Sequence, residues 1–212
     1  MANVSTHIDI VSQLKTELNP KIWNNKKLKS GIRSQLLKIA DSFMDEFGDI
    51  KLPVYDVIFT GSLCNYNWTQ FSDIDLHIVL DFTTKDVKQL KMIDVSDYFD
   101  TKRKLWNERF KVEVLGFPVE VYIQLKDEDH HSTGVFSVKH NKWTLEPSRE
   151  KFDVDKVNKY VALSKVKSIE KQIYELIDRN VVEPTEVEKL IDKIWDMRQK
   201  GLNEDGEFST NN

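Results

Sequence analysis

Apolar residues recur every three or four positions in several stretches of the chain, a spacing typical of amphipathic helices. Residues 5–18 follow this pattern, and residues 30–47 follow it most clearly, with Gly48 placed as a residue that ends a helix. Residues 84–92 and 95–110 show a weaker version. We therefore expect helices in the N-terminal part of the chain and again in its middle.

Between these stretches the pattern becomes that of strands. Residues 54–60 are almost continuously apolar, as in a strand at the centre of a sheet. Residues 73–80 alternate, so that Asp73, Asp75 and His77 share one face and apolar residues share the other. This second strand is expected to have one face in the core and one face in water.

Four shorter runs complete the expected sheet. Residues 111–115 and 119–125 flank Gly116-Phe117-Pro118, which predicts a hairpin. Residues 134–139 and 142–145 flank a second turn. Together with the helices, these strands indicate an α+β fold with a mixed β-sheet.

The C-terminal part is helical again. Residues 154–180 carry one long apolar stripe, and residues 185–188, Thr-Glu-Val-Glu, form a capping box that predicts a second helix to about Lys200. The two helices would form a C-terminal helical hairpin. We therefore divide the chain into a domain with N-terminal helices, a C-terminal helical segment and a polar tail expected to be disordered, with bounds 1–150, 151–200 and 201–212.

Composition narrows the function classes. The 212 residues include 31 Lys and Arg against 35 Asp and Glu, a net charge of −4, so that a nucleic-acid contact would need a local patch. The basic stretch 21–29 is either such a patch or a solvated loop anchored by Trp23 in the core. The single cysteine, Cys64, excludes an intramolecular disulfide. No secretory or membrane-spanning run is present, and a cytoplasmic protein with no membrane partner is expected.

The candidate chemistry lies between the first two strands. Gly61-Ser62 is followed after ten residues by Asp73-Ile74-Asp75. A glycine lets the backbone approach a phosphate, and a serine adds a hydroxyl and an N–H group. Two carboxylates on one strand face repel each other unless a cation lies between them. The pattern therefore favours a divalent-metal site for phosphoryl or nucleotidyl transfer.

These residues resemble the signature of the DNA polymerase β-like nucleotidyltransferase superfamily, with the form Gly-Ser followed by Ser-Asp-Ile-Asp-Leu-His at 72–77. The motif covers about residues 54–125. Three further phrases, at 18–23, 119–122 and 141–143, resemble uncharacterised nucleotidyltransferase-like proteins encoded largely by bacteriophages, which would place the protein in the host cytoplasm.

The resemblance implies a nucleotidyltransferase-like sheet and a role for each motif residue. Gly61 and Ser62 would hold the triphosphate of an NTP, with ATP expected, and Asp73 and Asp75 would bind Mg²⁺ or Mn²⁺. The superfamily uses a third carboxylate on a later strand, and Glu120 matches it best. Glu113 is the competitor, because a two-residue hairpin loop at Gly116-Phe117 would place it opposite Glu120.

The implied reaction is the transfer of an NMP from an NTP to a hydroxyl of an RNA, such as a tRNA-like acceptor, a protein or a small molecule. One ion held by all three carboxylates would activate the acceptor hydroxyl, and another held by Asp73 and Asp75 would stabilise the leaving pyrophosphate. The alternatives are a non-catalytic nucleotide-binding or interaction protein and a metal-dependent phosphohydrolase. The sequence leaves the oligomeric state open.

Other side chains near the motif have two interpretations each. His77 either touches the acceptor or forms a hydrogen bond that supports the metal ligands. Tyr66 and Trp68 either stack on a base or cover the core. Residues 102–104, Lys-Arg-Lys, either contact phosphates or form a solvated helix face.

Overall fold

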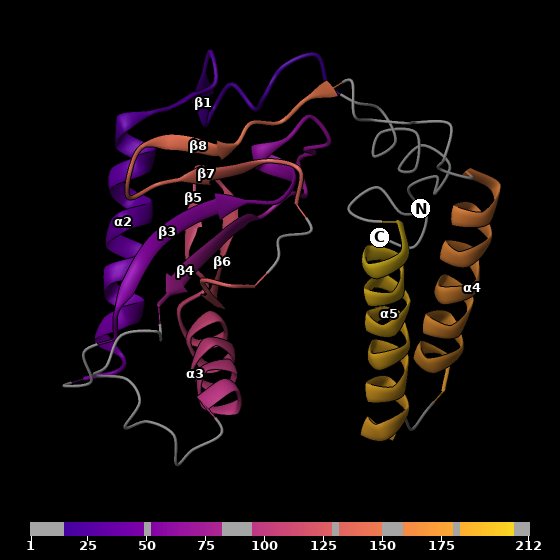
Figure 1. The fold of residues 1–212 in the computed structure, drawn as a ribbon. Helices are drawn as coiled ribbons and strands as arrows, with labels where there is room; N and C mark the ends of the chain where they lie inside the picture. Colours follow the sequence, from indigo (N-terminus) through magenta and orange to yellow (C-terminus); the bar gives the residue numbers. More distant parts are fainter. Residues whose placement is uncertain are drawn as a thin grey trace. The chain divides into compact units, whose positions relative to one another are not determined.

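The computed structural model describes residues 15–48, 52–81, 95–128, 132–149, 159–179 and 183–205. The chain forms two compact units. The sheet unit is Leu14–Ser148, and the helical unit combines Met1–Gln13 with Arg149–Asn212. Figure 1 shows the helices and strands of both units.

The sheet unit is built on a six-stranded mixed sheet with the order β5-β6-β4-β3-β7-β8 (Figure 1). Strands β4 and β6 are parallel, and the other neighbours are antiparallel. The mixed sheet and the flanking helices confirm the α+β class. The strands are β3 (Val54–Thr60), β4 (Ile74–Leu80), β5 (Glu113–Val114), β6 (Phe117–Leu125), β7 (Val135–Ser137) and β8 (Lys142–Leu145).

The turn between β5 and β6 differs from the expected one. Val114 pairs with Phe117, so the loop residues are Leu115 and Gly116, with φ values of 54° and 81°. Positive φ at both central residues defines the type I′ turn, whose twist matches that of the flanking strands. Phe117 is buried as the first residue of β6. The hairpin expected around Gly116-Phe117-Pro118 is present, but its loop is neither the two-residue loop Gly116-Phe117 nor a three-residue loop that includes Pro118.

Helices α2 (Ser30–Asp45) and α3 (Val95–Phe110) pack apolar residues into the core beside the sheet. Ring centroids of Phe43 in α2 and Trp106 in α3 lie 5.7 Å apart, at an edge-to-face angle of 88°. Both residues belong to one buried cluster with the apolar face of β4. That cluster includes Ile32, Leu36 and Ala40 of α2 and Ile74, Leu76 and Ile78 of β4. The opposite face of β4 carries Asp75 and His77, followed by Val79, which is buried with Ile58 and Val135 in a second, smaller cluster.

The segment before α2 corrects another expectation. The predicted helix over 5–18 is absent from residues 15–18, and residues 5–14 lie outside the described part of the chain. Asn19 begins a turn, because its backbone carbonyl accepts hydrogen bonds from the backbone N–H groups of Ile22 and Trp23. A short hairpin of β1 (Trp23–Asn24) and β2 (Lys27–Leu28) follows. Trp23 is buried, so the predicted anchoring of this stretch in the core is confirmed.

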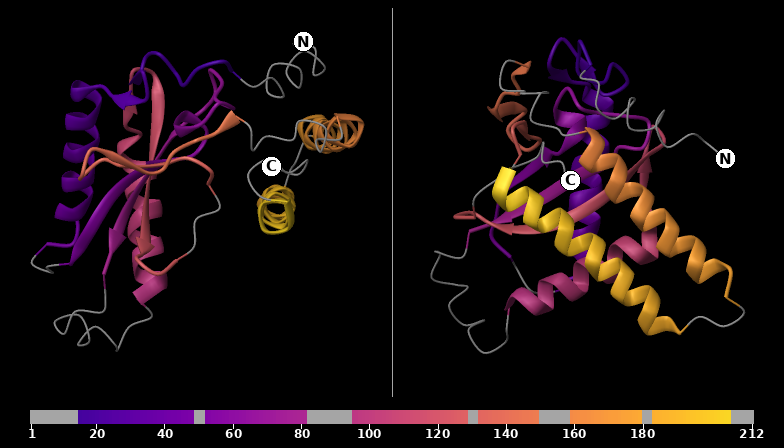
Figure 2. Two further views of the ribbon diagram at one scale, coloured as in Figure 1. Left: turned by 45° about the horizontal axis from the view of Figure 1, so that its top comes forward. Right: turned by 90° about the vertical axis from the view of Figure 1, so that its right-hand side faces the viewer.

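The helical unit contains α4 (Lys159–Ile177) and α5 (Pro184–Asp205), which lie side by side in each view (Figures 1 and 2). An ion pair between Arg179 and Glu186, 2.7 Å long, joins them near the hairpin turn. Helix α5 begins at Pro184, because proline fits the first helical position, where no N–H bond is lost. The capping box therefore lies inside the helix.

Helix α5 runs to Asp205, which corrects the expected start of the polar tail at Gly201. Residues 206–212, like the predicted helix 84–92, lie outside the described residues. No helix in the ranges that the structure describes combines the length and the apolarity needed to cross a membrane.

Candidate functional site

The glycine turn after β3 lies next to the carboxylate of Asp75. Gly61 has φ 77° and ψ −165°, a region that is essentially restricted to glycine. A Cβ atom added to Gly61 would lie 1.9 Å from Oδ2 of Asp75. The sequence therefore needs glycine here for two reasons, the backbone conformation and the space taken by Asp75.

The serine after the glycine is tied to the residue that precedes the first aspartate. Ser62 opens the short 3-10 helix η1 (Ser62–Cys64), and its Oγ donates a hydrogen bond to Oγ of Ser72 at 2.7 Å. The same Ser72 oxygen accepts a hydrogen bond from the backbone N–H of Thr69 at 2.9 Å. These contacts bring the two parts of the motif, ten residues apart, to one place.

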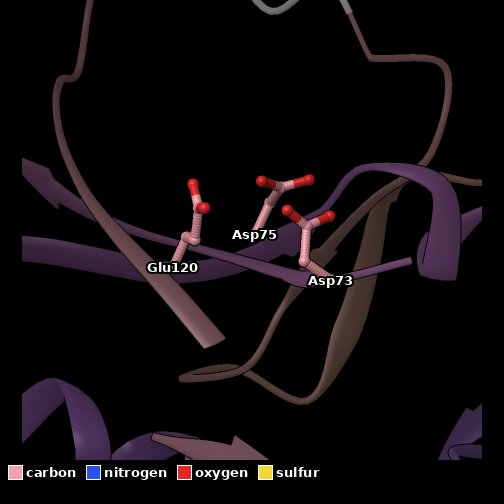
Figure 3. Close-up of side chains that lie close together, drawn as sticks. All are labelled: Asp73, Asp75 and Glu120. Atoms are coloured by element: carbon pink, nitrogen blue, oxygen red, sulfur yellow. The ribbon is translucent and has the colours of Figure 1, made fainter. Parts of the chain in front are cut away.

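Strand pairing gathers the three carboxylates. Asp73 directly precedes β4, and Asp75 shares its face by alternation. In the parallel pair of β4 and β6, Asp75 is the register partner of Glu120. Figure 3 shows the three side chains projecting to the same side of the sheet. One oxygen of each lies within 4.8 Å of the others, and all three side chains are partly exposed.

This grouping discriminates between the two glutamates that the sequence offered. Glu113 pairs with Pro118, not with Glu120, because the hairpin loop is Leu115-Gly116. Within the described residues, the acidic group contains Glu120 and not Glu113. Three carboxylates at such a distance repel one another, and a divalent cation would offset that repulsion. Carboxylate oxygens are also the donors that Mg²⁺ and Mn²⁺ prefer, so the residues fit such an ion.

A tyrosine contacts the third carboxylate. The hydroxyl of Tyr122, two residues along β6, donates a hydrogen bond to Oε2 of Glu120. Burial raises the pKa of Tyr122, and the hydrogen bond to Glu120 and the charge of Asp75 raise it further. The phenol is therefore a hydrogen-bond donor at neutral pH. Alternation along residues 119–125 predicts that Tyr122 shares the face of Glu120. No signal in the sequence predicts the hydrogen bond between the two side chains.

The basic residues of α3 have partners within the protein. Hydrogen bonds from Lys104 and Arg103 lower the pKa of Asp100, and Lys102 donates to the backbone carbonyl of Glu46 at 3.1 Å. The Arg103 guanidinium also lies 5.0 Å from the ring centroid of Tyr122. These contacts favour structural roles for the stretch 102–104.

His77 lies one strand step beyond the carboxylates. Its register partner is Tyr122, and the two ring centroids are 4.9 Å apart. Its Nδ1 atom is 2.9 Å from Oε1 of Gln124. The hydrogen bond and the ring contact therefore hold the imidazole on the same face as the carboxylates.

The backbone next to Glu120 is held by helix α3. Strand β5 pairs with β6 only at Phe117 and Pro118, so the outer edge of β6 needs other partners further along. The Asn107 side chain accepts a hydrogen bond from the Val121 backbone N–H at 3.0 Å and donates one to the Val121 carbonyl at 3.1 Å. The sequence gives no periodic signal for such a contact between a helix and a strand edge.

The aromatic residues of the motif loop act as covers of the core. Tyr66 is buried, and Trp68 packs against the main cluster. The Trp68 indole donates to the backbone carbonyl of Glu17 at 2.9 Å. These contacts favour the core interpretation of both residues over base stacking.

Comparison with known proteins agrees with this geometry. The family model described as "Nucleotidyltransferase domain" matches residues 36–144, just over half of the chain. The matched part contains Gly61, Ser62 and the three grouped carboxylates. No curated protein and no solved structure matches the chain. The chain belongs to the nucleotidyltransferase domain family, within the DNA polymerase β-like superfamily.

Proposed function

We propose that this protein is a metal-dependent nucleotidyltransferase that transfers an NMP from an NTP, with ATP as the first candidate, to a hydroxyl of an acceptor. The observation that carries the proposal is the grouping of three carboxylates, with oxygens within 4.8 Å of one another, on and directly before two paired strands of a nucleotidyltransferase domain. Asp73, Asp75 and Glu120 would hold Mg²⁺ or Mn²⁺.

The glycine turn is the proposed triphosphate site. Gly61 has no side chain to block the backbone, and its contact with Asp75 brings the turn next to the carboxylates. Ser62 is partly exposed at the start of η1 and offers a hydroxyl and a backbone N–H. A phosphate bound at Ser62 would therefore lie beside the metal ligands.

The carboxylates and the glycine turn have different roles in the proposed reaction. Bound divalent ions would supply positive charge to the phosphates and lower the pKa of the attacking hydroxyl. The rigid strands β4 and β6 fix where Asp75 and Glu120 stand, because seven consecutive residue pairs hold them in register. The turn would orient the triphosphate so that the acceptor hydroxyl can attack the α-phosphorus and pyrophosphate can leave.

The first prediction concerns Asp75. We expect the wild-type protein, incubated with labelled NTPs, Mg²⁺ or Mn²⁺ and pools of RNA, protein or small-molecule acceptors, to transfer label to one acceptor class. Asp75→Asn keeps the shape of the side chain and removes its charge, so transfer should fall by more than about a hundredfold. Gel separation and chromatography of the labelled products measure the transfer.

Asp81→Asn is the matched control. Asp81 follows β4 at its other end and forms an ion pair with Lys126 at 2.7 Å, so the same chemical change is made away from the carboxylate group. Its transfer rate should stay near that of the wild type. Nucleotide binding without transfer would contradict the proposal and favour a binding protein. Release of phosphate or NMP without an acceptor would favour a phosphohydrolase.

A further inference from the structure

We infer that Tyr122 is a positioning residue for the third carboxylate, holding Glu120 in the orientation in which it binds metal. The inference rests on the proposed function, in which Glu120 is a metal ligand. It starts from one contact, the hydrogen bond from the Tyr122 hydroxyl to Oε2 of Glu120. Within the described part of the chain, this is the hydrogen bond that the Glu120 carboxylate accepts from another side chain.

The strand explains why a tyrosine is needed at this position. Residues 120 and 122 project from the same face of β6, about 7 Å apart along the chain. A phenol is long enough to reach back to a carboxylate two residues away. A glutamate side chain has three rotatable bonds, and one fixed oxygen removes most of its freedom. The other oxygen, Oε1, would then be the one available to a metal ion.

The tyrosine is itself held on two sides. The His77 ring lies against it with centroids 4.9 Å apart, and the Arg103 guanidinium lies 5.0 Å from its ring centroid. These neighbours come from β4 and α3, so they restrict the ring independently of Glu120. A ring fixed in this way can impose its position on the more flexible glutamate.

The backbone of the same segment is fixed by a different residue. Asn107 bonds both the N–H and the carbonyl of Val121, the residue between Glu120 and Tyr122. The Cα position of Glu120 therefore does not depend on the tyrosine hydroxyl. Removing that hydroxyl should release only the end of the glutamate side chain, which makes the effect of Tyr122 separable from the folding of β6.

Tyr122→Phe tests the inference, because it removes the hydroxyl and keeps the ring. Isothermal titration calorimetry of the full chain with Mn²⁺ alone should show about 10- to 100-fold weaker binding, the usual effect of losing a hydrogen bond to a metal ligand. In the transfer assay the Mn²⁺ concentration for half-maximal rate should rise to a similar extent. The KM for the NTP at saturating Mn²⁺ should change little.

Tyr55→Phe is the matched control. Tyr55 is half exposed near the start of β3, and it should bind Mn²⁺ as the wild type does. A double-mutant cycle with Glu120→Gln adds the decisive comparison. If Tyr122 acts through Glu120, then Tyr122→Phe should weaken Mn²⁺ binding by less than about twofold when Glu120 is already replaced.

The outcomes separate the inference from the function on which it rests. If the wild type binds no Mn²⁺, the proposed function fails. If Glu120→Gln weakens binding but Tyr122→Phe does not, only the positioning role of Tyr122 is overturned. Additive effects in the double variant would also overturn it, because they would show that the two residues act independently. Circular dichroism and thermal unfolding without metal check that each variant is folded.

Discussion

Gly61 and Asp75 constrain each other at the scale of single residues. The glycine lies in a backbone region closed to other residues, with the Asp75 carboxylate in the space that a side chain would need. Gly61→Ala should therefore lower the free energy of unfolding by about 1–3 kcal/mol from backbone strain alone. It should also displace Asp75 and weaken Mn²⁺ binding by more than tenfold, on the order of the loss seen when metal ligands are misplaced. Urea unfolding and calorimetry measure the two effects.

Gly48→Ala is the control that separates the effect of backbone strain from the effect of displacing Asp75. Gly48 also has a positive φ, 58°, but nothing lies within 4 Å of an added Cβ. Its replacement should cost about 1–2 kcal/mol for the left-handed conformation and leave Mn²⁺ binding unchanged. Equal Mn²⁺ affinities for the two alanine variants would contradict the contact between Gly61 and Asp75.

Part of the candidate site could be predicted from the residues alone. Alternation along a strand places Asp73 and Asp75 on one face, and the same rule places Glu120 with Tyr122. The hydrogen bond between Tyr122 and Glu120 could not be predicted, because it depends on side-chain rotamers set by neighbours from β4 and α3. The contact of Gly61 with Asp75 depends on the antiparallel register in which Thr60 faces Asp75.

At the scale of elements, the sequence predicted those helices and strands that have a long periodic apolar pattern of their own. The helix α2 and the strand β3 form where their sequences indicate, since each has a long apolar pattern of its own. The β1–β2 hairpin was missed because two-residue strands are too short to show a period. The turn at Leu115-Gly116 was misplaced because the burial of Phe117, which fixes the register, is a tertiary contact.

The β1–β2 hairpin supports the glycine turn through Trp23. Its indole donates to the buried carbonyl of Leu63 at 2.7 Å, directly after Ser62, and its ring stacks against Phe59 and Trp143. Trp23→Phe keeps an aromatic ring but leaves that carbonyl without its donor. We expect a loss of about 1–3 kcal/mol in the free energy of unfolding, the cost of an unsatisfied buried group. Chemical denaturation followed by circular dichroism measures it.

Trp143→Phe is the control at the same scale. The Trp143 indole also donates to a backbone carbonyl at 2.7 Å, that of Lys26, but at an exposed site where water can replace it. Both variants lose the same ring atoms, although Trp23 is buried and Trp143 is only partly buried. The Trp143 variant should therefore lose less stability than the Trp23 variant. Equal losses would show that ring size, and not the bond to Leu63, determines the contribution of Trp23.

At the scale of the whole molecule, the candidate chemistry belongs to one unit. The main buried cluster extends from Leu18 to Val138, all within the sheet unit. The family match at 36–144 and the three carboxylates lie within the same limits. Among the described residues of α4 and α5, Ile173, Ile191 and Trp195 are exposed. We therefore propose that the sheet unit, Leu14–Ser148, is the catalytic domain; its C-terminal limit is close to the expected residue 150, whereas its N-terminal limit is Leu14 and not residue 1.

Preparing the two units as separate fragments tests whether the sheet unit folds and binds metal without the helical unit. A fragment of residues 14–148 keeps every member of the main cluster, so it should unfold cooperatively in urea, with far-ultraviolet circular dichroism typical of a mixed α+β protein. It should bind Mn²⁺ within about twofold of the full chain, since no proposed ligand lies outside it. A fragment of residues 149–212 should be marginally helical, because two helices bury too little apolar surface to fold alone. A sheet fragment that folds but binds Mn²⁺ more than about tenfold more weakly would mean that the helical unit contributes to the metal site.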